Sequence, residues 1–250
     1  MPKYKITIEY NGTSFNGWAP QKNSLSISNL IVDAVHQFYK GEVKLHGAGR
    51  TDTGVHAKGQ VAHFCIEKDM SNRSMMNAIN FYLKSKDIVI LKVEKMPIES
   101  DFHARFSAKE RVYKYIICER KARLTFEKNL YWHYYYDLDI SLLQKASKLL
   151  IGTHDLSSFR GKGCQANSPI RTINDIKIFR NNNNPDLIEF IISAPSFVYH
   201  QVRNIIGTIV LVGSKKITIE DFQTIINSKD RTKAGITAPP HGLYFLEIKY

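Results

Sequence analysis

The sequence predicts an α+β fold made of two similar halves, each an antiparallel sheet with helices on one face, with an active-site cleft between the halves. Two observations predict it. Segments with strand periodicity and segments with helix periodicity are interspersed along the chain, and each half contains several of both. The 250 residues, 43% of them hydrophobic, suffice for two cores. We expect an N-terminal α+β domain at residues 1–105, which carries a glycine-rich loop, and a C-terminal α+β domain at 106–250.

The first half has a β-α-β-α-β pattern. Apolar and polar residues alternate over 4–10, which predicts a strand with one buried face. Apolar residues at spacings of three and four predict a helix over 27–38. The remaining elements are a strand at 60–67, a helix at 71–84 that Ser71 can cap, and a strand at 87–95.

The second half is predicted in the same way. It comprises strands at 107–119, 172–180, 187–193 and 242–250 and helices at 139–151, 197–212 and 219–227. The turn-forming run Asn181-Asn182-Asn183-Asn184-Pro185 predicts a hairpin between two of these strands. Thr218 and Asp221 have the spacing of a capping pair at the start of the last helix.

The composition favours a polyanionic partner. Lys and Arg total 35 against 23 Asp and Glu, a net charge of +12, so nucleic acid is the leading candidate and a merely soluble basic surface is the alternative. No apolar run reaches the roughly 20 residues of a membrane span, and the N-terminus leads straight into a strand and not into a signal peptide. We therefore expect a cytoplasmic protein that does not enter a membrane.

Motifs for common cofactors do not match. Gly47-Ala48-Gly49 begins like a dinucleotide-binding loop, but the next glycine is Gly54, and Asp52 would repel a pyrophosphate. Neither a Walker loop, an HExxH helix, a GxSxG elbow nor a paired-cysteine site occurs. We expect no cofactor and no metal, and structural roles for most of the nine histidines.

Asp52 is the candidate catalytic acid, because it lies in the glycine-rich loop 47–57 near Arg50 and His56. Glycines allow a tight loop that presents the carboxylate, and a neighbouring arginine keeps it ionised. Such a carboxylate can act as a nucleophile or as a base. Glycosidases normally need a second carboxylate, and none is visible in the sequence nearby, which suits isomerisation of a base on its own sugar. The alternative is that Asp52 only forms an ion pair with Arg50 or caps a turn.

Two further positions are candidates for contact with a ligand. Arg111, Tyr113 and Tyr115 share one face of a predicted strand, so Tyr113 could stack on an unpaired base, although packing in the core is the default role of a strand tyrosine. Arg203 lies on a largely apolar predicted helix, where an arginine needs a carboxylate partner.

Six motifs, in order along the chain, resemble those of the tRNA pseudouridine synthase A family. They are Glu9 to Trp18, the loop 47–57, Arg111 to Tyr115, Gly152 to Phe159, Val202 to Gly207 and Ala238 to Tyr244. The resemblance covers essentially the whole chain. The sequence departs from the family pattern at Ala19-Pro20 and at Ser28, both outside the loop that carries Asp52.

The resemblance implies specific roles. Asp52 would be the essential aspartate that attacks or deprotonates the target nucleotide, and Tyr113 would pack on the target base. Arg203 would pair with Asp52, and Arg50 would help to displace the base and hold the RNA backbone. Family members convert uridines at positions 38, 39 and 40 of the tRNA anticodon stem-loop to pseudouridine as homodimers, without cofactor or metal. We therefore expect tRNA as partner and a homodimer.

Two other classes of function stay open at this point. The chain could be a non-catalytic RNA-binding α+β protein that uses its sheet, or a nucleoside or glycoside hydrolase that uses Asp52. Substitution of Asp52 would leave a pure binding protein unchanged. Release of free uracil from RNA would identify a hydrolase.

Overall fold

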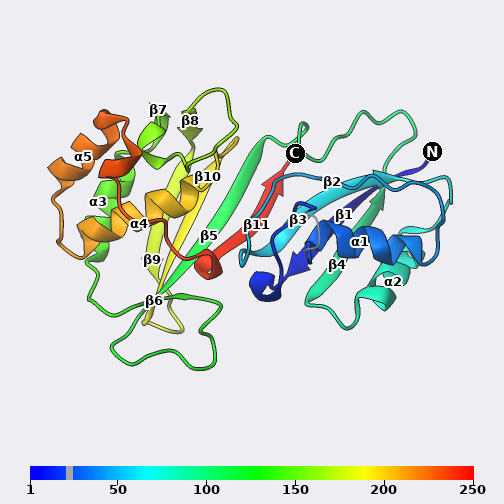
Figure 1. Cartoon of the computed structure of the whole chain (residues 1–250), viewed down its shortest axis with the longest axis horizontal. Helices are drawn as coiled ribbons and strands as arrows, with labels where there is room; N and C mark the ends of the chain where they lie inside the picture. Colours follow the sequence, from blue (N-terminus) through cyan, green and yellow to red (C-terminus); the bar gives the residue numbers. More distant parts are fainter. Residues whose placement is uncertain (21–24) are drawn as a thin grey trace. The chain divides into compact units, whose positions relative to one another are not determined.

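The chain folds into two compact units in a computed structural model that describes residues 1–20 and 25–250. Unit 1 comprises Met1–Lys109 and Tyr244–Tyr250, and unit 2 comprises Glu110–Leu243. Both units combine helices with a sheet, which confirms the α+β class (Figure 1). The last residues of the chain belong to unit 1, whereas we expected all residues after 105 in one domain.

The sheet of unit 1 is mixed, not purely antiparallel as we expected. Its strands are β1 (Lys3–Tyr10), β2 (His46–Gly47), β3 (His56–Cys65), β4 (Ile88–Lys95) and β11 (Leu243–Lys249). β1 lies between β3 and β4 and is antiparallel to both, and β2 is antiparallel to β3. β11 runs parallel to β3, with Tyr244 opposite His56.

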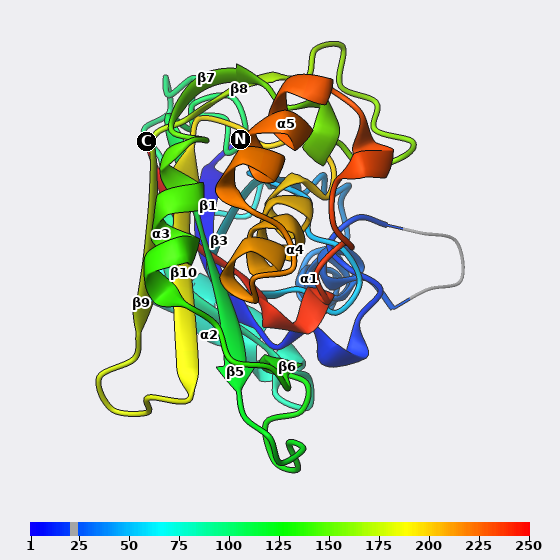
Figure 2. The ribbon, with the colours of Figure 1, turned by 90° about the vertical axis from the view of Figure 1, so that its left-hand side faces the viewer.

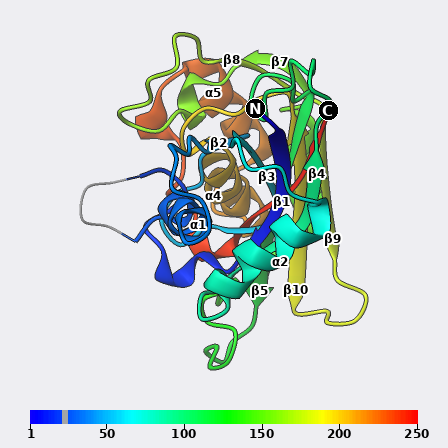
Figure 3. The same cartoon turned by 90° about the vertical axis from the view of Figure 1, so that its right-hand side faces the viewer.

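One face of β1 forms the centre of the core of unit 1. Tyr4, Ile6, Ile8 and Tyr10 are each at most 2% exposed, as their alternation predicts. The helices α1 (Ile27–His36) and α2 (Asn72–Leu83) lie next to each other along the strands (Figure 3). The Ser71 hydroxyl accepts a hydrogen bond from the Ser74 N–H at 3.1 Å, which confirms the predicted cap of α2.

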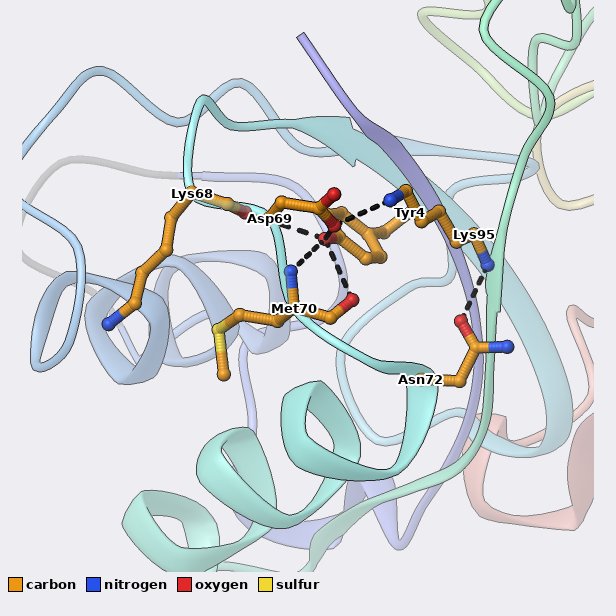
Figure 4. A network of polar contacts seen from close by, with 6 residues as sticks. All are labelled: Tyr4, Lys68, Asp69, Met70, Asn72 and Lys95. Carbon is orange, nitrogen blue, oxygen red and sulfur yellow. Dashed lines mark hydrogen bonds and ion pairs between the residues drawn. The ribbon is translucent and has the colours of Figure 1, made fainter.

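A buried hydroxyl fixes the approach to α2 (Figure 4). The Tyr4 hydroxyl accepts a hydrogen bond from the Met70 N–H at 2.8 Å and has the Met70 carbonyl oxygen within 3.1 Å as an acceptor. The Asn72 side chain accepts from the Lys95 N–H at 2.8 Å, which links the start of α2 to β4. The network holds β1, β4 and the start of α2 together.

The strands of unit 2 also pair in a mixed pattern, and two of them form a separate two-stranded ribbon. Its strands are β5 (Glu110–Glu119), β6 (Trp132–Tyr134), β7 (Gly152–Asp155), β8 (Ile170–Ile173), β9 (Asp175–Arg180) and β10 (Leu187–Ala194). β10 is antiparallel to β5 and β9, and β6 is parallel to β5. β7 and β8 form the ribbon. The antiparallel pairing of β9 and β10 confirms the hairpin predicted from the asparagine run.

Three helices lie together beside β9 and β10 in unit 2 (Figure 2). They are α3 (Ile140–Lys148), α4 (Gln201–Gly213) and α5 (Ile219–Ser228). α4 begins at Gln201 and not at 197, because His200 has a φ of 61°, outside the right-handed helical region. The capping box of Thr218 and Asp221 is present as predicted. Of the helices in the described residues, none has the length and apolar character needed to cross a membrane.

Three histidines meet in unit 1 beside β2. The pairing of β2 with β3 places His46 opposite His63, with ring centroids 5.0 Å apart, and the His103 ring lies 4.7 Å from His63. His63 is only 5% exposed, and its Nδ1 accepts a hydrogen bond from the Ala104 N–H at 3.1 Å. Burial, aided by the charges of His103, His46 and Lys3, lowers the pKa of His63 to about 4.

This pKa predicts a pH dependence of stability. Because His63 has an ordinary pKa of 6.5 in the unfolded chain and about 4 in the fold, the unfolded state binds the proton more tightly between these values. The free energy of unfolding should therefore fall as the pH drops from 6.5 to 4, by about 1.4 kcal/mol per pH unit, and the contribution should be constant above pH 6.5. Urea unfolding at pH 7 and pH 5 measures this loss.

His63→Asn is the matched variant, because its side-chain oxygen can still accept from the Ala104 N–H. Between pH 7 and pH 5, the free energy of unfolding of this variant should fall by about 2 kcal/mol less than that of the wild type. An equal loss in both proteins would show that His63 does not titrate as its surroundings require.

Candidate functional site

The loop that carries Asp52 connects β2 to β3 in unit 1, so both of its ends are fixed in the sheet (Figure 1). The Ala48 N–H donates to the Val61 carbonyl at 2.8 Å and continues the pairing beyond β2. The fully buried Gln60 donates from Nε2 to the Gly49 carbonyl at 2.9 Å and accepts at Oε1 from the Val61 N–H at 3.1 Å. One amide side chain thus holds the first part of the loop against β3.

Asp52 stands at the tip of the loop, where the chain turns. The Val55 N–H donates to the Asp52 carbonyl at 3.2 Å, and Gly54 has a φ of 77°. That backbone conformation favours glycine and closes the turn tightly. Asp52 is half-buried, and Arg50 is exposed. The structure therefore has the tight turn at Asp52 that the glycines predict.

The segment after β1 packs backbone to backbone on this loop. A Cβ atom added at Gly12 would lie 2.0 Å from the Val55 carbonyl oxygen. One added at Gly17, whose φ is 85°, would lie 2.5 Å from the Thr51 carbonyl oxygen. Such contacts are open only to glycine. These two glycines of the first motif therefore shape the second.

Side chains of the first motif fix the residue before Asp52. The Tyr10 hydroxyl and the Thr51 Oγ1 are 2.8 Å apart in a buried hydrogen bond, and burial raises the pKa of Tyr10 so that its phenol stays protonated. The Trp18 N–H donates to the Thr51 carbonyl at 3.1 Å. The Trp18 ring covers Gly47, where an added Cβ would lie 2.5 Å from the indole nitrogen. Thr51 is thus held by both side chain and backbone.

His56 anchors the end of the loop. His56 is 1% exposed, and its Nδ1 accepts a hydrogen bond from the Gly12 N–H at 2.9 Å. The same ring stacks on Tyr244 of β11 with centroids 4.7 Å apart. An Nδ1 atom that accepts from a backbone N–H carries no proton itself. His56 has a structural role, as we expected for most histidines of the chain.

In unit 2, Tyr113 lies on β5 opposite Ile192 of β10. It is 9% exposed, and its ring meets Phe197 edge to face at 5.3 Å. Arg111, on the same face of the strand, donates a hydrogen bond to the Pro195 carbonyl. The strand motif is thus packed largely in the core, and Tyr113 as a residue keeps only a small exposed surface.

Arg203 lies in the first turn of α4 and is joined to Ala238 twice. Its Nε donates to the Ala238 carbonyl at 2.7 Å, and the Ala238 N–H donates to the Arg203 carbonyl at 3.1 Å. Burial, followed by the charge of Arg203, lowers the pKa of His241. The Arg203 charge also acts on Tyr115, whose pKa burial raises far above the ordinary value. Arg203 is therefore a fixed cation next to both side chains.

The last motif closes around Tyr115. Its hydroxyl donates to the Pro239 carbonyl at 2.8 Å, and a Cβ added at Gly242 would lie 2.6 Å from its ring. Three motifs that are far apart in the sequence, on β5, on α4 and at 238–242, therefore form one cluster in unit 2. The structure places Asp52 and Arg50 on one loop of unit 1, and Tyr113 and Arg203 in this cluster.

Sequence reasoning from single residues missed the groups that support the loop, namely Tyr10, Gln60 and Thr51. The sequence gives little indication of this supporting role, because a tyrosine or glutamine on a strand can have many other roles. Gly12 and Gly17, which stand in the first motif, were the usable signal. In the described ranges 1–20 and 25–250, no three His, Cys, Asp or Glu side chains are grouped so as to hold a metal ion.

The fold and the loop define a class of protein, an α+β enzyme that acts on nucleic acid. Its strongly basic chain presents a carboxylate from a braced turn.

Comparison with known proteins gives the family. A model described as tRNA pseudouridine synthase matches residues 6–107 and 146–250. "tRNA pseudouridine synthase A" of Wolbachia pipientis wMel is 47% identical over 99% of this chain and 100% of its own length. The corresponding proteins of Ehrlichia chaffeensis and Methylocella silvestris are 45% and 41% identical, over 99% and 100% of this chain and over 100% and 99% of their own lengths.

The chain belongs to the tRNA pseudouridine synthase A family. This confirms the family that the six motifs resemble and the predicted isomerase function, and it decides against the binding-protein and hydrolase alternatives. A solved structure of a "Cbf5-Nop10-Gar1 Complex" matches 83% of this chain and 45% of that chain at 12% identity, with a TM-score of 0.38, which is too low to support an argument.

The contact between Gly12 and the Asp52 loop predicts a large effect of Gly12→Ala. The added Cβ would collide with the Val55 carbonyl, and because the colliding atoms belong to the backbone, one of the two segments would have to shift. We expect a loss of about 3 kcal/mol or more in the free energy of unfolding, and loss of isomerase activity in the protein that still folds. Urea unfolding and tritium release from 5-labelled tRNA measure the two effects.

Gly163→Ala is the control, because nothing lies within 4 Å of its added Cβ although its φ is 79°. It should cost only the strain of the left-handed conformation, about 1 to 2 kcal/mol, and should keep full activity. If both variants lost the same stability and activity, the close contact at Gly12 would have no special role.

Proposed function

We propose that this chain isomerises uridine to pseudouridine at positions 38, 39 and 40 of the tRNA anticodon stem-loop, with Asp52 as the reacting group. The observation that carries the proposal is the braced turn. Tyr10, Gln60 and Trp18 hold the residues before Asp52, and the hydrogen bond from the Gly12 N–H to His56 holds the end of the loop after it. A carboxylate held in this way keeps its position relative to a bound nucleotide. The resemblance of the loop to the family motif supports the assignment of Asp52.

The reaction exchanges one bond for another at the same sugar carbon. The bond from uracil N1 to C1′ breaks, the uracil rotates in place, and C5 bonds to C1′ while the proton on C5 leaves. The Asp52 carboxylate starts this exchange either by attack on C1′ or by removal of a proton from the 2′ carbon. Water has to be excluded while the uracil is detached, because it would otherwise capture C1′ and complete a hydrolysis.

The target base has to leave its stack before C1′ can be reached, at a cost of about a few kcal/mol. We assign the stacking contact that offsets this cost to Tyr113, whose ring is held edge-on by Phe197. Arg50 is exposed on the same loop as Asp52, and a guanidinium there can take the place of the displaced base and bind a phosphate. The basic composition of the chain supports the remaining contacts to RNA.

Arg203 is proposed as the cationic partner of Asp52 in the working enzyme. The double link to Ala238 supports this role, because it holds the guanidinium in one orientation. A cation near the carboxylate keeps the carboxylate ionised at neutral pH. The assignment rests on the resemblance to the family.

We further propose that the enzyme acts as a homodimer in the cytoplasm and needs neither a cofactor nor a metal. These expectations follow from the family resemblance and from the sequence pattern. Sedimentation of the full chain with and without tRNA tests the dimer, and activity after treatment with a chelator tests the metal.

Substitution of Asp52 tests the central assignment. Asp52→Ala should reduce tritium release from 5-labelled, unmodified tRNA by at least about a thousandfold, because the reacting group is gone. Its affinity for tRNA and its stability should stay close to the wild-type values, since the turn is held by other residues. Asp33→Asn, which removes an exposed carboxylate on α1, is the control and should keep full activity. Normal turnover by Asp52→Ala would disprove the assignment.

Substitution of Tyr113 separates stacking on the base from binding of the whole tRNA. Tyr113→Leu keeps an apolar side chain on β5 but removes the ring, and should lower single-turnover isomerisation about tenfold or more, with less than about a twofold change in Kd for tRNA. Tyr113→Phe should restore most of the rate. Tyr82→Leu, at an exposed tyrosine of α2, is the control. Equal losses of rate and affinity in Tyr113→Leu would contradict its contact with the target base.

A further inference from the structure

Aromatic rings gather on the surface of unit 1 directly before the Asp52 loop. His46, the first residue of β2, is exposed, and its ring centroid lies 5.3 Å from that of His103. The Phe106 ring centroid lies 4.4 Å from that of His103, and Phe106 is 76% exposed. The Arg105 guanidinium carbon lies 5.7 Å from the Phe106 centroid. We call His46, His103, Phe106 and Arg105 the ring platform.

Residues of the sheet of unit 1 support the ring platform. His63 is buried beneath it and contacts both other imidazoles, with ring centroids 5.0 Å from His46 and 4.7 Å from His103. Lys3 donates to the Ser100 and Phe102 carbonyls at 2.7 and 2.9 Å and so fixes the chain before His103 to β1. The exposed rings are therefore supported by the sheet.

The turn that carries Phe106 is also fixed. The His103 Nδ1 accepts from the N–H groups of Arg105 and Phe106 at 3.1 and 3.4 Å. The His103 N–H donates to the Ser107 hydroxyl at 3.0 Å, and the Ser107 N–H donates back to the His103 carbonyl at 2.9 Å. A ring on a rigid turn loses little conformational entropy when a ligand binds to it.

These rings are suited to stacking rather than to ion pairing. Burial, followed by the charges of His46 and Lys3, lowers the pKa of His103, so its imidazole is neutral at pH 7. The His103 and Phe106 rings offer π surface, and Arg105 adds a positive charge beside Phe106. This combination matches a nucleotide, whose base stacks on aromatic rings and whose phosphate binds arginine. A single exposed phenylalanine would need no explanation, but a fixed group of three rings with an arginine does.

We propose that the ring platform binds an unpaired nucleotide of the tRNA, other than the target uridine, through stacking on Phe106 and His46 and a phosphate contact to Arg105. The assignment rests on the proposed function. Its place in the chain supports it, because His46 is joined directly to Gly47 at the start of the Asp52 loop. The platform would fix the substrate at a second point on unit 1.

Phe106 is tested through affinity for unmodified tRNA, measured by fluorescence anisotropy at several salt concentrations. Phe106→Ala and Phe106→Leu should each raise Kd about five- to tenfold through the loss of stacking. The dependence of log Kd on log salt should not change, because no charge is removed. Phe106→Leu keeps an apolar side chain, so a loss in both variants is due to the ring, and thermal unfolding verifies that both are folded.

Phe81→Ala is the matched control. Phe81 is also an exposed phenylalanine of unit 1, at 60%, and also has a cation near its ring, with Lys84 Nζ 5.0 Å from the centroid, but it lies on α2. Its removal should leave Kd for tRNA unchanged. Arg105→Gln should weaken binding and reduce the salt slope by about one, as expected for the loss of one phosphate contact.

The outcomes separate this inference from the proposed function. Suppose that the wild-type protein releases tritium from tRNA but both Phe106 variants bind tRNA like the wild type. The proposal that the ring platform binds a nucleotide is then wrong, and the proposed function is retained. If the wild type releases none while the Phe106 variants lose affinity, the platform stands and the function fails. An equal loss in Phe81→Ala would show a nonspecific effect and would also overturn the platform.

Discussion

The arrangement of the Asp52 loop depends on one constraint, the close approach of two backbones. The Val55 and Thr51 carbonyl oxygens leave no room for a Cβ at Gly12 and Gly17, so the segment after β1 and the loop can only meet where both residues are glycine. Once they meet, the Gly12 N–H reaches the His56 ring and the Trp18 N–H reaches the Thr51 carbonyl. The close approach thus precedes both of these hydrogen bonds, whereas Gln60 of β3 holds the first part of the loop independently.

Local patterns predicted the helices and most strands, because the spacing of apolar residues reflects which face each element buries. The same patterns could not predict elements that depend on distant partners. β2 has only two residues and exists through its pairing with β3, and β11 belongs to unit 1 through a parallel pair with β3. The start of α4 was misplaced because His200 has a positive φ, which an apolar pattern does not reveal.

The residues of the candidate site also divide into those that local sequence indicates and those that depend on distant partners. Asp52 was selected as a candidate because an acid among glycines is unusual, and Tyr113 and Arg203 because of their places on a predicted strand and a largely apolar predicted helix. The family resemblance then gave these candidates specific roles. Gln60 and Tyr10 were not found, because each contributes a hydrogen bond to one residue of the loop, and such partners are known only from the fold. His103 and Phe106 were likewise overlooked, since their relation to His46 comes from the pairing of β2 with β3.

Rigid support of the loop bears on the kind of reaction that the proposed site performs. A hydrolase has only to cleave the bond to the base, whereas an isomerase has to keep the detached uracil near C1′ until a second bond forms. Small movements of the carboxylate or of the RNA would admit water in that interval. The hydrogen bonds to Thr51 and Gly49 form in the folded protein before RNA arrives, so the loop needs little further ordering when substrate binds. A braced loop, beside a second surface that holds the RNA, is therefore suited to rearrangement of a uridine rather than to its cleavage.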